Sequence, residues 1–62
     1  MRYTKAKRRR YCVTLMCYNE RESLVITEYV ETFSKQAAED IARSQLVGYY
    51  RLVDVMTCEL AR

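Results

Sequence analysis

The sequence has few of the residues that interrupt regular structure or exchange protons near neutral pH. Its 62 residues include one glycine and no proline, tryptophan or histidine. Without histidine, the chain lacks both a common metal ligand and the usual proton-transfer group at pH 7. Without proline, its edge strands lack one of the residues that block further strand pairing. We therefore expect regular structure with little catalytic equipment.

The length allows one small domain, and half of the residues are apolar, which predicts that the chain folds. A domain of this size buries only about 60% of its unfolded surface, so a deep catalytic cleft is not expected. The eight carboxylates are spread along the chain, and the cysteines have no histidine to activate them. We therefore expect a non-enzymatic protein with no cofactor.

Asp54 is a charged residue between two valines. Our preferred interpretation is that its charge protects a strand edge from further pairing, and the alternatives are a partner contact or an ion pair with Arg51.

The charge is distributed unevenly. Residues 1–10 carry six basic and no acidic side chains, whereas residues 11–62 carry five basic and eight acidic ones. We interpret this as a basic N-terminal arm (1–10) followed by a single, mildly acidic domain (11–62). Such an arm attracts polyanions, although a solvated terminus that only aids solubility is an equal alternative.

The three cysteines, Cys12, Cys17 and Cys58, include no CxxC pair, so neither a metal site nor a disulfide framework is expected. Reduced, buried thiols would suit the cytoplasm. The sequence has neither a secretory signal pattern nor an apolar run of about 20 residues, so we expect no membrane segment.

The hydrophobic pattern predicts four elements: strands over about 11–18 and 24–33, a helix over 35–47, and a strand over 49–60. Ser34 is a suitable helix N-cap, with Ala38, Ile41, Ala42 and Leu46 on the apolar stripe. Gly48 is expected to end the helix in a left-handed conformation, and a change of apolar phase near Glu28 predicts a bulge.

This order predicts an α+β, β-β-α-β fold: a three-stranded antiparallel sheet of order 2-1-3 with one helix packed on one face. The helix, about 20 Å long, covers one face only. Because each strand carries apolar residues at both odd and even positions, whose side chains lie on opposite faces, the face away from the helix should expose an apolar, tyrosine-rich surface. We therefore expect function by contact, with a homodimer, a protein partner or a ribonucleoprotein. The alternatives are an arm that folds back over this face, or a sheet that curls around it.

Direct nucleic-acid binding through the basic arm is the alternative function, because its cations can neutralise phosphates and its tyrosines can stack on bases. No recognised nucleic-acid-binding motif is present, and the body of the chain is acidic. For both functions the predicted contact residues are the same aromatic and basic side chains: Arg8, Arg9, Arg10, Tyr11, Tyr18, Tyr49, Tyr50 and Arg51.

The segment 31–42, ETFSKQAAEDIA, followed by YRLVDV at 50–55, resembles the strand–Ser–amphipathic-helix–strand pattern of very small phage-encoded proteins. Some anti-CRISPR proteins are similar in size and arrangement. The resemblance covers about residues 24–58 and implies a non-enzymatic inhibitor that binds a host defence complex. It is a pattern of residue types, also found in unrelated domains, and assigns no individual residue a role.

Overall fold

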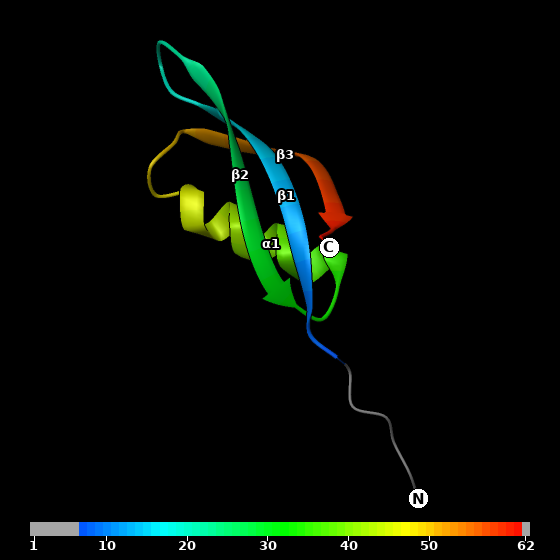
Figure 1. Cartoon of the computed structure of the whole chain (residues 1–62). Helices are drawn as coiled ribbons and strands as arrows, with labels where there is room; N and C mark the ends of the chain where they lie inside the picture. Colours follow the sequence, from blue (N-terminus) through cyan, green and yellow to red (C-terminus); the bar gives the residue numbers. More distant parts are fainter. Residues whose placement is uncertain (1–6, 62) are drawn as a thin grey trace, which may run out of the picture.

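The computed structural model describes residues 7–61, which form one sheet and one helix (Figure 1). The elements, in chain order, are β1 (Arg9–Tyr18), β2 (Ser23–Thr32), α1 (Lys35–Leu46) and β3 (Leu52–Leu60). The strands are antiparallel in the order β2-β1-β3. The predicted β-β-α-β fold and strand order are therefore confirmed.

The two strand pairings differ in regularity. β1 pairs with β2 without a shift, from Arg9 opposite Thr32 to Tyr18 opposite Ser23. The pairing of β1 with β3 shifts between Thr14 and Leu15, where Met56 is the extra residue on β3. The predicted bulge near Glu28 is wrong: as a half-buried residue of an edge strand, Glu28 can reach solvent without leaving the regular register.

The helix begins as predicted and ends differently. The Oγ of Ser34 accepts a hydrogen bond from the backbone N–H of Ala37 at 3.1 Å. Gly48 does not adopt a positive φ, so its predicted left-handed conformation is wrong. Instead, the N–H of Val47 donates to the carbonyl of Arg43 at 3.0 Å, with Val47 itself still in the right-handed region.

The third strand begins at Leu52, three residues later than predicted. The backbone N–H groups of Tyr49 and Tyr50 donate to the carbonyl of Leu46 at 2.9 and 3.2 Å, so these residues complete the helix end instead of pairing with β1. The N–H of Arg51 then reaches the carbonyl of Tyr18 at 2.9 Å, which brings the chain back to the sheet.

The hydrophobic core lies between α1 and one face of the sheet (Figure 1). Its buried residues are Tyr11, Val13, Leu15 and Cys17 of β1, Val30 of β2, Ala38, Ala42 and Leu46 of α1, and Val53 of β3. The two alanines are fully buried, which lets the helix backbone approach the strands. Ile41, expected on the buried stripe, lies at its exposed margin. Within residues 7–61, no helix is long and apolar enough to cross a membrane.

Candidate interaction surface

The sheet face opposite α1 is formed by the even-numbered residues of β1 and their cross-strand partners, and we call it the open face. It comprises Arg10, Cys12, Thr14, Met16 and Tyr18 of β1, Ser23, Val25, Thr27, Tyr29 and Glu31 of β2, and Leu52, Asp54, Thr57 and Glu59 of β3. Three of its large apolar side chains are more than half exposed: Val25 (53%), Leu52 (55%) and Tyr29 (60%). Within residues 7–61, no helix or strand covers the open face.

The chemistry of the open face changes along the strands. At the hairpin end, half-buried Met16 pairs with Val25 and half-buried Tyr18 with Leu52, and these four side chains form an apolar patch. Its polar neighbours on the outer strands are Asp54, opposite Met16, and Ser23, opposite Tyr18. The middle is a row of three hydroxyls, because Thr14 lies between Thr27 and Thr57. The expectation of an apolar, tyrosine-rich face thus holds for the hairpin end and for Tyr29, but not for the middle.

Charge on the open face is predominantly acidic. Three exposed carboxylates, from Glu31, Asp54 and Glu59, share it with one guanidinium, that of Arg10. Arg10 lies over the ring of Tyr29, with its Cζ 4.8 Å from the ring centroid, which holds this cation against the sheet. A partner that matches this face presents apolar groups flanked by basic ones.

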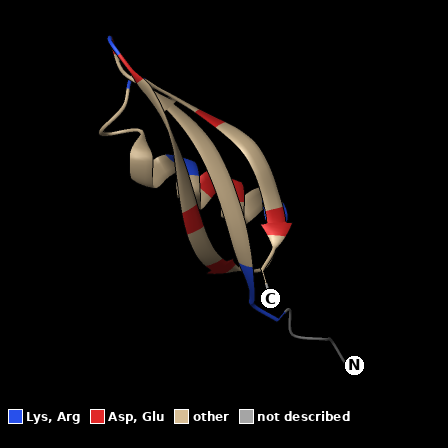
Figure 2. Ribbon diagram, turned by 45° about the horizontal axis from the view of Figure 1, so that its top comes forward, with Lys and Arg blue, Asp and Glu red and all other residues tan. Residues whose placement is uncertain are grey.

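A basic group lies beside this face at the start of β1 (Figure 2). Lys7, Arg8, Arg9 and Arg10 are all exposed, and Nη2 of Arg8 donates to the carbonyl of Glu31 at 3.2 Å. Arg9 and Arg10, assigned above to the arm, lie in β1. Residues 1–6 of the predicted arm lie outside the described residues.

The predicted contact residues separate into groups. Tyr11 has an odd position in β1, is 7% exposed and belongs to the core, so its prediction as a contact residue is corrected. Tyr50 is half-buried and packs against that core. Tyr18 lies on the open face, and Tyr49 is exposed in the connection after α1. Arg51 lies near Tyr18, at the end of the sheet opposite to Arg8, Arg9 and Arg10.

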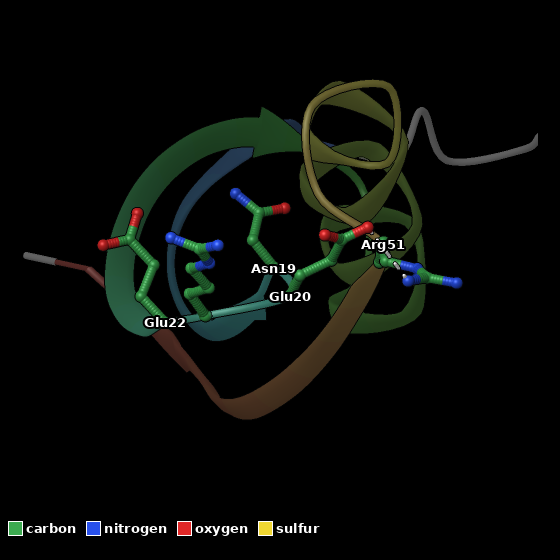
Figure 3. Close-up of a pocket in the computed structure, with 5 residues that line it drawn as sticks. Asn19, Glu20, Glu22 and Arg51 are labelled. Atoms are coloured by element: carbon green, nitrogen blue, oxygen red, sulfur yellow. Dashed lines mark hydrogen bonds and ion pairs between the residues drawn. The ribbon is translucent and has the colours of Figure 1, made fainter.

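Arg51 borders a shallow hollow at the hairpin loop, lined by Asn19, Glu20, Arg21 and Glu22 (Figure 3). Its Nη1 lies 3.4 Å from Oε1 of Glu20, and both side chains are largely exposed. An exposed pair of this kind contributes at most about 1 kcal/mol. Arg51 therefore pairs with Glu20 and not with Asp54, and the balanced charges of the hollow do not select an ionic ligand.

The cysteines have structural positions. All three are free; Cys17 is buried, whereas Cys12 and Cys58 are half-buried. Burial, with a smaller contribution from Glu28, raises the pKa of Cys17. Burial also raises the pKa of Cys58, whose Sγ lies 3.7 Å from the carbonyl oxygen of Lys35. A raised pKa lowers the thiolate fraction and hence nucleophilic reactivity. No group of three or more Cys, Asp and Glu side chains in residues 7–61 is arranged to hold a metal ion.

Sequence reasoning overlooked the residues that contribute most apolar area to the open face: Val25, Tyr29 and Leu52. The strand register identifies all three, because each pairs with an even-numbered residue of β1 and therefore lies on the same face of the sheet as that residue.

Comparisons with family models, curated proteins and solved structures gave no match to this chain.

Proposed function

We propose that this chain is a non-enzymatic interaction module that binds a host protein, free or in a complex with nucleic acid, through its open face. One observation carries the proposal: α1 packs against one face of the sheet, while Val25, Tyr29 and Leu52 remain more than half exposed on the other. Exposed apolar side chains that share one sheet face are typical of an interaction site, and four others with comparable or greater exposure (Phe33, Val47, Tyr49 and Met56) lie off this face. The surrounding carboxylates favour a partner with basic groups around an apolar centre.

The proposal can be tested with two matched substitutions. Leu52→Asp places a charge in the apolar end of the open face, whereas Val47→Asp does so at the end of α1, where the exposure is similar (55% and 57%). Affinity capture from host lysate, with and without nuclease, is followed by binding measurements with the purified candidate. We expect a nuclease-resistant partner that Leu52→Asp weakens at least tenfold and Val47→Asp leaves unchanged. Equal binding by both variants would refute the assignment of the face.

The finer role as a phage-encoded inhibitor of a host defence complex remains a proposal based on the resemblance of residues 31–42 and 50–55. It requires that the captured partner be a component of such a system and that the chain reduce that system's activity. A partner from another process would exclude this role while leaving the open face as the contact surface.

Direct nucleic-acid binding is a second candidate because Lys7, Arg8, Arg9 and Arg10 are consecutive and exposed. Binding of this kind weakens steeply with salt and has little sequence preference. Replacing Lys7, Arg8 and Arg9 with serine should then abolish binding to single-stranded RNA or DNA, and Leu52→Asp should have little effect. The opposite result would favour the open face.

A further inference from the structure

The two edges of the sheet differ in their capacity to accept another strand. On β3, the extra residue Met56 interrupts the regular pattern. Both edge strands carry two carboxylates, Asp54 and Glu59 on β3 and Glu28 and Glu31 on β2, so the bulge is what distinguishes the two edges. Bulges and charges are the devices that protect natural edge strands from pairing. β2 has no irregularity along its ten residues. Its run Leu24-Val25-Ile26-Thr27 is rich in residues that favour strands.

We infer that the free edge of β2 pairs with β2 of a second copy of this chain, forming a continuous six-stranded antiparallel sheet. The inference concerns the edge and does not depend on the proposed partner of the open face. Two features of β2 support it: the regular register and a residue pattern that complements itself when the strand is reversed.

Geometry limits the possible registers. A two-fold axis perpendicular to the sheet keeps both open faces on the same side. Odd-numbered residues of one β2 must therefore oppose odd-numbered residues of the other, and even-numbered residues must oppose even-numbered ones. Two such registers pair nine residues of each ten-residue strand, and they are centred on Thr27 and on Glu28. The register centred on Glu28 places two carboxylates directly opposite each other, which is destabilising. The register centred on Thr27 avoids this contact.

The Thr27-centred register forms favourable side-chain pairs at Val25 and at Leu24, whereas Ile26 opposes a carboxylate. On the open face, Val25 opposes Tyr29 of the second copy, which is a favourable pair of a β-branched and an aromatic residue. On the helix side, Leu24 opposes Val30, and Ile26 opposes Glu28. All six residues lie in β2, and Leu24, Val25 and Tyr29 are exposed in the single chain. The pairing joins two open faces into one surface twice as wide.

Thr27 and Thr57 provide a matched experiment. Both are exposed threonines of the open face, and both oppose Thr14, but Thr27 lies on the β2 edge and Thr57 on the β3 edge. In the inferred dimer the two Thr27 side chains face each other. Thr27→Lys should therefore place two cations directly opposite each other, at a Cβ separation of about 5 Å, whereas Thr57→Lys leaves β2 unchanged.

Sedimentation velocity over a range of concentrations measures the outcome, with circular dichroism to confirm that each variant folds. We expect a dimer for the wild type and Thr57→Lys, and at least a tenfold increase in the dimer dissociation constant for Thr27→Lys. Thr27→Glu should behave like Thr27→Lys, and a mixture of these two variants should form a heterodimer.

Three results would overturn the inference. These are a wild-type monomer at all concentrations, a dimer that Thr27→Lys leaves intact, and dissociation by Thr57→Lys as well as by Thr27→Lys. The last result would indicate stacking of open faces. None of them affects the partner test, which compares Leu52→Asp with Val47→Asp.

Discussion

The coverage of one sheet face by α1 predicts that two neighbouring residues of β1 differ in their contribution to stability. Leu15 is fully buried beneath the helix, whereas Met16 is half-buried on the open face. Substitution of either by alanine removes three non-hydrogen atoms. For Leu15→Ala, three buried carbons at about 0.8 kcal/mol each amount to about 2.4 kcal/mol, and the cavity raises the loss to at most about 5 kcal/mol.

This loss is large for a small domain, because native stabilities are about 0.05–0.15 kcal/mol per residue, or about 3–9 kcal/mol for this chain. Met16→Ala leaves a space open to solvent, and we expect it to cost less than about 1 kcal/mol. Urea titration followed by far-UV circular dichroism measures both free energies of unfolding. Dilute protein keeps the chain monomeric during the measurement. Equal losses would refute the reasoning, since Met16 would then be as well covered as Leu15.

Three further predictions concern the helix ends and the buried thiol. Ser34→Ala should lower the free energy of unfolding by about 1 kcal/mol because the N–H of Ala37 loses its acceptor, and Ser34→Asp should retain most of the stability. Gly48→Ala should raise the melting temperature, with a gain of about 0.4–1 kcal/mol, because Gly48 has no positive φ and a Cβ there meets no atom within 4 Å; destabilisation would contradict the observed helix end. Because burial raises the pKa of Cys17, the unfolded chain ionises first as pH rises. The free energy of unfolding should therefore fall above about pH 8.5, and less steeply in Cys17→Ala; identical pH profiles of the two proteins would contradict this.

Those features of the fold that depend on local pattern were predictable from the sequence. The apolar first strand predicted its central position, and the order of elements with the crossover rule then determined 2-1-3. Ser34 was predictable as a cap because its hydroxyl acts on the next turn of the same segment.

The errors occurred where distant contacts decide local conformation. The residues after α1 could be read as strand or helix end, and the hydrogen bonds to the carbonyl of Leu46 favour the helix end. The position of the bulge depends on how β3 meets β1, which the alternation within β2 cannot indicate. Tyr11 was read from its basic neighbours as a contact residue, although its parity with Val13 and Leu15 already indicated the core.

The exposed apolar area also limits how the chain can bind. Complete burial of a large apolar side chain contributes about 1.5–3 kcal/mol, and Val25, Tyr29 and Leu52 are already about half buried. They therefore offer about 1 kcal/mol each, whereas association costs at least about 4 kcal/mol in lost translational and rotational freedom. These three side chains do not meet this cost alone. Pairing of β2 edges would present two such faces on one rigid sheet, and the basic residues at the start of β1 would add charged contacts. Both contributions would add to the proposed binding through the open face, which the comparison of Leu52→Asp with Val47→Asp tests separately.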